Sequence, residues 1–213
     1  MDSHECLQIT VRAATLSDIP FIQDIARRTW TDTYRGVIAE DAQAAVLGRA
    51  YSKEALTVSI GRGQAFLVAE VCGGQAVPSD PAVDGDSTVD SVPTVHCSND
   101  RLAGYVDVDY DGRQANLHRL YVLPEYQRLG LGKRLLQEAV AQTLARLPAG
   151  SSCPLVAYVE RDNTRARAFY KKMGFAEGEE EIVIIGGISL PVIRISMTVG
   201  GDGSADKDRS CCG

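Results

Sequence analysis

The sequence predicts an α+β protein in which helices flank a central mixed, mostly antiparallel sheet. The predicted elements begin with a strand and a group of helices and continue in the order β, β, β, α, β, α, β, β, which is an α+β pattern. A chain of 213 residues, 45% of them apolar, is long enough to bury one substantial core. Turn signals at Asp111-Gly112 and Gly186-Gly187 place hairpins between the strands that they join.

The first half of the chain begins with residues 8–12, whose alternating side chains predict a strand. Thr15 or Ser17 can cap a helix that runs to about Trp30, and Gly36 ends the segment that follows it. The remaining elements of this half are helical stretches over residues 40–47 and 53–60 and a branched, apolar strand over residues 65–71.

The second half carries two predicted helices between strands. An amphipathic helix begins at Leu131, and its apolar stripe continues until Pro148. Asn163 caps a shorter helix, and Gly174 stands where a left-handed C-cap is expected. The predicted strands of this half are residues 102–110, 115–123, 155–159, 181–185 and 190–199.

Residues 72–100 differ in composition from the rest of the chain. They contain three prolines, three glycines and five aspartates, but no lysine or arginine and no hydrophobic period. This composition predicts a disordered acidic insertion within a single domain of residues 1–199, followed by a flexible tail over residues 200–213. The net charge of the chain is −6. The five aspartates of the insertion account for most of this charge, so the rest of the chain is nearly neutral.

Composition also excludes several classes of protein. No basic stripe suggests a nucleic-acid partner, and no apolar run approaches the roughly 20 residues of a membrane span. The polar N-terminus is not a signal peptide, so we expect a cytoplasmic protein with reduced thiols. The six cysteines form no Cys-x-x-Cys pair and the three histidines are scattered, so no metal site is expected. Homodimer formation is left open.

A glycine pattern stands where a strand meets the amphipathic helix. Pro124 stops the apolar run, and Gln127-x-x-Gly130-x-Gly132 leads into the helix. Glycines let backbone N–H groups approach a ligand closely, and the first N–H groups of a helix have no partner within it. The helix dipole favours negative charge there, so the segment is a candidate pyrophosphate cradle. It is neither a Walker A loop nor a three-glycine dinucleotide fingerprint.

A second block lies in residues 159–175. It contains Asn163, an alanine, the pair Phe169-Tyr170 and the pair Gly174-Phe175, in that order. Together the two blocks resemble the GNAT superfamily, the GCN5-related N-acetyltransferases, in order and in spacing. The resemblance covers about residues 8–199. It implies the GNAT fold, acetyl-CoA as co-substrate without a metal, and transfer of acetyl to a primary amine of a small molecule or peptide.

The resemblance also implies the residues that hold the cofactor. It assigns the backbone of Leu120 and Val122 to the acetyl and pantetheine groups, and it gives Asn163 a cofactor contact, which is compatible with its role as a helix cap. The loop assigned to the pyrophosphate consists of Gln127, Arg128, Leu129, Gly130, Leu131, Gly132 and Lys133. The side chains of Leu120 and Val122 are expected to be core, and Arg128 and Lys133 are equally compatible with an ordinary helix surface.

Two residues are implied in catalysis. Tyr170 matches the tyrosine that faces the CoA sulfur in the family and would protonate the leaving thiolate; the alternative is a packing residue beside Phe169. Many members carry a glutamate where this chain has Asn116. His118 lies two residues further on the same strand face and could serve as the base instead. Leu117 to Leu120 is similar to the Leu-His-Ala-Leu of arylalkylamine N-acetyltransferases; a histidine without chemistry is the alternative.

The acceptor site is the least defined by sequence. Trp30 and Tyr34 stand in a segment that resembles the first helical region of polyamine and ribosomal-protein acetylating GNAT branches, and Asn116 is a further candidate. Acidic residues there, Asp32 among them, could hold a cationic amine or could simply be solvated. A second hypothesis remains: a GNAT-fold acyl-CoA sensor without catalysis, which the asparagine at position 116 favours.

Overall fold

The structure is a computed structural model that describes residues 7–62, 64–73, 101–185 and 188–200. Its sheet has seven strands in the order β1-β2-β3-β4-β5-β7-β6, and within it only β4 and β5 pair in parallel among the described strands. This agrees with the predicted mixed, mostly antiparallel sheet. The strands are β1 (Leu7–Ala13), β2 (Ala65–Gly73), β3 (Arg101–Tyr110), β4 (Ala115–Val122), β5 (Ser152–Glu160), β6 (Ala176–Ile185) and β7 (Ile188–Gly200).

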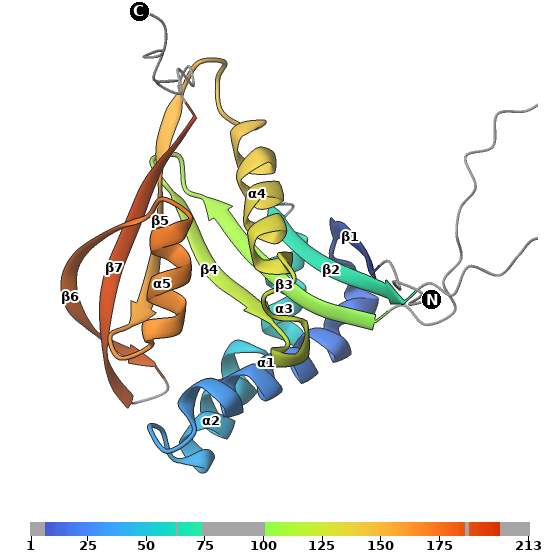
Figure 1. Ribbon diagram of the computed structural model, residues 1–213, viewed down its shortest axis with the longest axis vertical. Coiled ribbons are helices and arrows are strands. Elements are labelled where there is room, and N and C mark those ends of the chain that lie inside the picture. Colours follow the sequence, from blue (N-terminus) through green and yellow to red (C-terminus); the bar gives the residue numbers. More distant parts are fainter. Residues whose placement is uncertain (1–6, 63, 74–100, 186–187, 201–213) are drawn as a thin grey trace, which may run out of the picture.

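Helices cover both faces of the sheet (Figure 1). The α-helices are α1 (Ile19–Tyr34), α2 (Glu40–Ala50), α3 (Lys53–Gly61), α4 (Leu131–Leu144) and α5 (Thr164–Lys172), and the short 3-10 helices are η1 (Leu16–Asp18) and η2 (Pro124–Tyr126). Alternate residues of β2 serve the two faces: Leu67 packs in the cluster below α4 and α5, whereas Phe66 and Val68 pack against α1 and α3. The part of the sheet around β2 and β3 is therefore buried on both sides.

Most element boundaries fall within a few residues of the predicted ones. The first helix runs four residues past Trp30, because the rings of Trp30 and Tyr34 pack with centroids 4.8 Å apart and keep the last turn in place. Gly36, at φ +75°, follows that end. Cys72 and Gly73, which we assigned to the insertion, instead extend β2 and pair with Gln8 and Leu7.

Strands β4 and β5 share only a short ladder. Ala115 pairs with Leu155 and Asn116 with Val156, and no further pairs join the two strands. In β4 the register against β3 shifts between Leu117 and Arg119, so His118 is an extra residue, which is a β-bulge. Beyond it β4 turns away from β5, and Figure 1 shows the two strands diverging toward η2 and the foot of α5. The gap between them positions the candidate site.

Gly200, which we assigned to the tail, instead ends β7 and pairs with Ser152. Three sequence predictions lie outside the described residues: the remainder of the acidic insertion, residues 74–100, the turn at residues 186–187, and the tail of residues 201–213. Across the part of the chain that is described, no helix has the length and apolar character needed to cross a membrane.

Candidate active site

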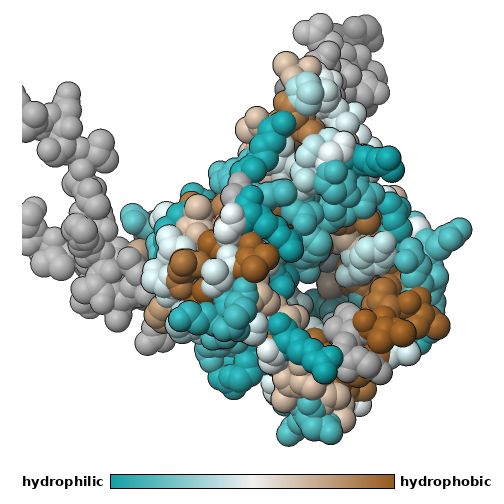
Figure 2. All heavy atoms as spheres, turned by 180° about the vertical axis from the view of Figure 1, so that it is seen from behind, coloured by the Kyte–Doolittle hydropathy of each residue, from teal (hydrophilic) through white to brown (hydrophobic). Residues whose placement is uncertain are grey.

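A cavity of about 690 Å³ fills the gap between β4 and β5. Its walls come from β4, the η2–α4 loop, α5, the end of β5 and the last turns of α1. In Figure 2, seen from behind, the surface is hollowed near its middle, on the face opposite to α4 and α5. A ligand can therefore approach the gap from a side that those two helices do not cover.

The backbone of β4 turns polar groups toward this cavity. Leu123 donates its N–H to Ala103 O of β3 at 2.8 Å. Because backbone groups alternate in direction along a strand, the N–H and C=O groups of Leu120 and Val122 point the other way, toward the gap that β5 has left. Their side chains are half-buried against the core below α4. This arrangement is consistent with the prediction that Leu120 and Val122 contact the cofactor through their backbone groups and not through their side chains.

The loop before α4 has the backbone geometry of an anion site. Arg128 at φ +65° and Gly130 at φ +86° both have left-handed conformations, and Gly130 is the N-cap of α4. The first helical hydrogen bond is from Arg134 N–H to Gly130 O, so the amides before it have no partner within the helix. Gln127 Nε2 donates to Val122 O at 3.0 Å and ties the loop to β4.

Gly132 and Gly130 differ in what a side chain would encounter at each position. A Cβ at Gly132 would stand 3.5 Å from the Phe169 ring, which is ordinary contact. A Cβ at Gly130 would meet open space, but its positive φ would strain any other residue. Lys133 is exposed beside the cradle, and Leu131 anchors the helix in the core. Leu129, half exposed, is the one residue of the predicted loop that does not line the described cavity.

Tyr170 lies on the opposite wall, on α5. Its ring packs edge-on against Phe169 and Phe175, with centroids 5.2 Å away in each case. Burial raises the pKa of Tyr170 above its ordinary value, so the hydroxyl stays protonated at neutral pH. Asn163 caps α5 by accepting from Ala166 N–H at 3.0 Å, and it also lines the cavity. Both predicted roles of Asn163 are therefore compatible with its position.

His118 lines the cavity at the bulge, and Asn116 does not. The imidazole Nε2 lies 2.8 Å from Asp109 Oδ2, and the Asn116 amide donates to Asp109 Oδ1 at 3.0 Å. The next residue, Arg119, is bound to the buried carboxylate of Asp107 and donates to Ala50 O at 2.9 Å. These contacts fasten the bulge to β3 and to the α2–α3 connection.

The two acceptor residues predicted in α1, Trp30 and Tyr34, differ in where they lie relative to the cavity. Tyr34 lines the cavity, and its burial together with the charges of Glu160 and Tyr51 raises the pKa of Tyr34 to about 12. Trp30 is buried beneath the wall and donates from Nε1 to the Tyr121 hydroxyl at 3.1 Å. Trp30 therefore supports the site rather than lining it.

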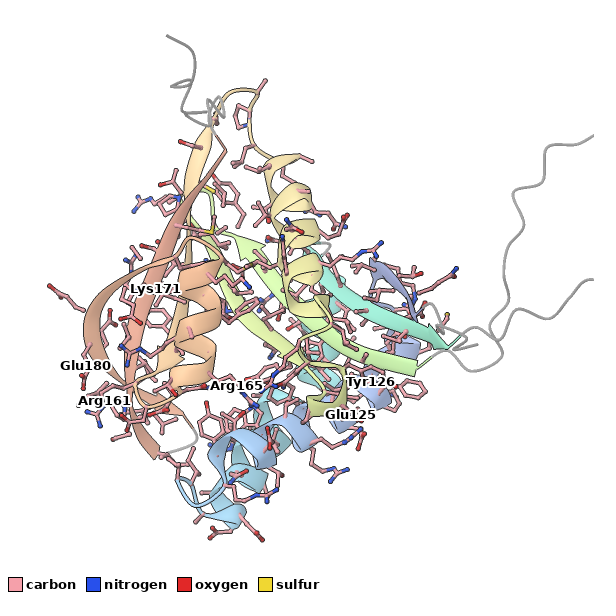
Figure 3. The ribbon with its side chains drawn as sticks, viewed as in Figure 1. Glu125, Tyr126, Arg161, Arg165, Lys171 and Glu180 are labelled. Carbon is pink, nitrogen blue, oxygen red and sulfur yellow. The ribbon has the colours of Figure 1, made fainter. Side chains whose placement is uncertain are left out.

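Sequence reasoning missed the charged residues at the end of β5. Glu160 lines the cavity close enough to Tyr34 to affect its pKa. Across the mouth, Arg165 Nη2 lies 3.1 Å from Asp32 Oδ2, and Figure 3 shows Arg165 at the N-terminal end of α5, on the side of the gap that faces α1. Glu160 stood within the quoted second block, but only the pairing of β5 beside β4 reveals that it faces the same cavity as His118.

The charged residues of the cavity do not form a metal centre. Among the residues that the structure describes, no three His, Cys, Asp or Glu side chains lie close enough together to hold a metal ion.

Comparisons with known proteins agree with this geometry. The family model of the GNAT acetyltransferase domain matches residues 92–177 of this chain. The chain is 30% identical over 169 residues to a spermidine N(1)-acetyltransferase of Thermoplasma acidophilum, a match that covers 79% of this chain and 89% of the relative. The chain therefore belongs to the GNAT family of acetyltransferases.

Solved structures give the same fold. The PaiA N-acetyltransferase of Thermoplasma acidophilum, in complex with coenzyme A, superimposes with a TM-score of 0.64 at 26% identity, covering 88% of this chain and 98% of that one. A GCN5-related N-acetyltransferase of Rhodopseudomonas palustris gives 0.61 at 18% identity, covering 93% and 99%. The latter similarity concerns the fold alone.

Proposed function

We propose that this protein is an acetyl-CoA-dependent N-acetyltransferase that acts on a primary amine of a small molecule or peptide. The relative named for spermidine makes a polyamine the first acceptor to test. We also take residues 1–199 as a single GNAT domain.

One observation carries the proposal. The divergence of β4 from β5 lines up three features on one cavity: the free backbone amides of Leu120 and Val122, the N-terminus of α4, and Tyr170. A thioester needs donors at its carbonyl oxygen, where charge develops, and its phosphates need N–H groups and a favourable dipole. Groups of each of these kinds line the same cavity, which supports the proposal.

The reaction needs a base at the amine nitrogen and an acid at the thioester sulfur. The amine nitrogen attacks the thioester carbonyl carbon, so a C–N bond forms and the C–S bond breaks. His118 takes the proton that the amine loses, and Tyr170 donates its proton to the departing sulfur. Burial raises the pKa of Tyr170, so at neutral pH the hydroxyl is in its protonated form and holds the proton that this step requires.

The walls near α1 provide the attraction for a cationic acceptor. Glu160 and Asp32 both line the cavity, and neither is fully buried, so each can contact an ammonium group without a large desolvation cost. Asp32 is bound to Arg165, whereas the carboxylate of Glu160 accepts only the backbone N–H of Asp162 among the described hydrogen bonds. Glu160 is the stronger candidate for binding the second ammonium of a diamine.

The test is thiol release from acetyl-CoA with a panel of polyamines, arylalkylamines, aminoglycosides and peptide N-termini. We expect release with at least one cationic amine and a mass increase of one acetyl group on that amine. Tight acetyl-CoA binding in calorimetry without release against any amine would favour the alternative, a GNAT-fold acyl-CoA sensor.

A further inference from the structure

The carboxylate that β4 lacks is present on the neighbouring strand. Asn116 occupies the position where many family members have a glutamate, and its cross-strand partner in β3 is Asp109. The bulge brings His118 to the same side, so Asn116 and His118 both contact Asp109. One side chain from β3 thus contacts both polar residues of β4 at this point.

Both oxygens of Asp109 are occupied. Oδ2 lies 2.8 Å from His118 Nε2 and 3.4 Å from Arg62 Nη1, and Oδ1 accepts from Asn116 Nδ2 at 3.0 Å. Asn116 in turn accepts from Gln114 Nε2 at 2.7 Å, which fixes the direction of its amide. The Asp109 side chain is 20% exposed and the His118 side chain 43% exposed, so the carboxylate is the anchored partner and the imidazole the accessible one.

We propose that Asp109 is the positioning residue for His118: it accepts the Nε2–H and leaves Nδ1 as the basic nitrogen that takes the proton of the amine. A neutral imidazole has one donor and one acceptor nitrogen, so a carboxylate at Nε2 selects this tautomer. His118 lines the cavity and Asp109 does not. Asp109 therefore acts through the histidine, and the proposal rests on the proposed function.

Both negative and positive side chains surround His118. On β3 they are Asp107 and Asp109, on β4 Arg119, and at the end of α3 Arg62. Asp107 and Arg119 neutralise each other in their own ion pair. The exposed Asp111 lies in the hairpin turn, 3.4 Å from Asn116 Nδ2 rather than beside the imidazole. Asp109 is thus the carboxylate whose removal should change the imidazole directly.

The experiment compares Asp109→Asn with Asp111→Asn. Both substitutions remove one negative charge from the same hairpin, and an asparagine at position 111 keeps an oxygen for the backbone N–H groups of Arg113 and Gln114. For Asp109→Asn we expect kcat/KM at pH 7 to fall about tenfold or more, with the dissociation constant of acetyl-CoA unchanged within about twofold. Asp111→Asn should match the wild type in both, and Asp109→Glu should recover part of the loss.

A double variant separates positioning from an independent structural role. If Asp109 acts only through the imidazole, it has nothing to position once the imidazole is gone. Adding Asp109→Asn to His118→Ala should therefore cost nothing further. Additive losses in the double variant would overturn the proposal.

A readout without turnover keeps this test separate from the proposed function. Nitrogen NMR of the His118 ring in the wild type should report the Nε2–H tautomer, and Asp109→Asn should weaken the preference for it. If no amine is acetylated but this tautomer is found, the proposed function fails and the Asp109–His118 pairing stands. If the Nδ1–H tautomer is found, the pairing is refuted whatever the activity.

Discussion

The two walls of the cavity are built in different ways. The cofactor wall, formed by the end of β4, η2 and the start of α4, presents backbone groups from one continuous stretch of residues 120–133. The acceptor wall presents side chains from β4, β5 and α1, with His118, Glu160 and Tyr34 among its polar members. A backbone site can be read from a local motif, whereas a side-chain site exists only after distant strands have paired.

The largest effect should come from a charge placed in the backbone cradle. Gly132→Asp should weaken acetyl-CoA binding at least about 100-fold, because a carboxylate would face the pyrophosphate at the N-terminus of α4. Gly132 has no positive φ, so the substitution does not strain the chain. Calorimetry measures the loss.

Gly132→Ala is the matched control for that variant. Its Cβ makes only ordinary contact with Phe169, so binding should stay within about fivefold of the wild type. Equal affinities for the aspartate and alanine variants, both folded, would mean that the phosphate binds elsewhere.

A smaller effect is expected across the cavity at Tyr170. Tyr170→Phe keeps the packing with Phe169 and Phe175 and removes only the hydroxyl. We expect kcat to fall about 100-fold, as is typical for a general acid, and acetyl-CoA affinity to hold. Because burial raises the pKa of Tyr170, the wild-type hydroxyl stays protonated up to about pH 10 and causes no alkaline loss of rate below that pH. Wild-type turnover in the variant would reduce Tyr170 to a packing residue.

Removal of the imidazole should follow in size. His118→Ala should lower kcat/KM at pH 7 about 10- to 100-fold and abolish the acidic limb that a general base produces in the pH profile. The limb is present in the wild type because the base must be neutral, so activity rises with pH. Survival of the limb in the variant would assign deprotonation to water or to another group.

The smallest effect concerns recognition of the acceptor. Glu160→Gln should raise the KM of a polyamine about fivefold, as expected for about 1 kcal/mol from a partly exposed ion pair, with kcat unchanged. High salt should reduce the difference between variant and wild type. Glu180→Gln is the control: Glu180 is bound to Arg161 at 3.1 Å on the outer side of the sheet, away from the cavity (Figure 3). Equal KM changes in both variants would exclude a specific role for Glu160.

These contrasts also explain what the sequence could predict. The strands and helices depend on local patterns, and the structure has most of them close to their predicted bounds. The cradle proposed over residues 127–133 depends on a local pattern as well. The β-bulge at His118 and the Asp109 contact depend on the register of β3 against β4, which no local pattern specifies. Glu160 faces the cavity because β5 lies beside β4 and then diverges from it. Pairing between distant segments therefore sets the part of the site that the sequence left open.

A crystal structure with coenzyme A and a polyamine bound tests the account most directly. We expect the pyrophosphate on the N–H groups at the start of α4, the sulfur between β4 and β5 within about 3.5 Å of the Tyr170 hydroxyl, and the amine on the side of His118 and Glu160. A pyrophosphate bound away from α4, or a sulfur separated from Tyr170 by the sheet, would contradict it.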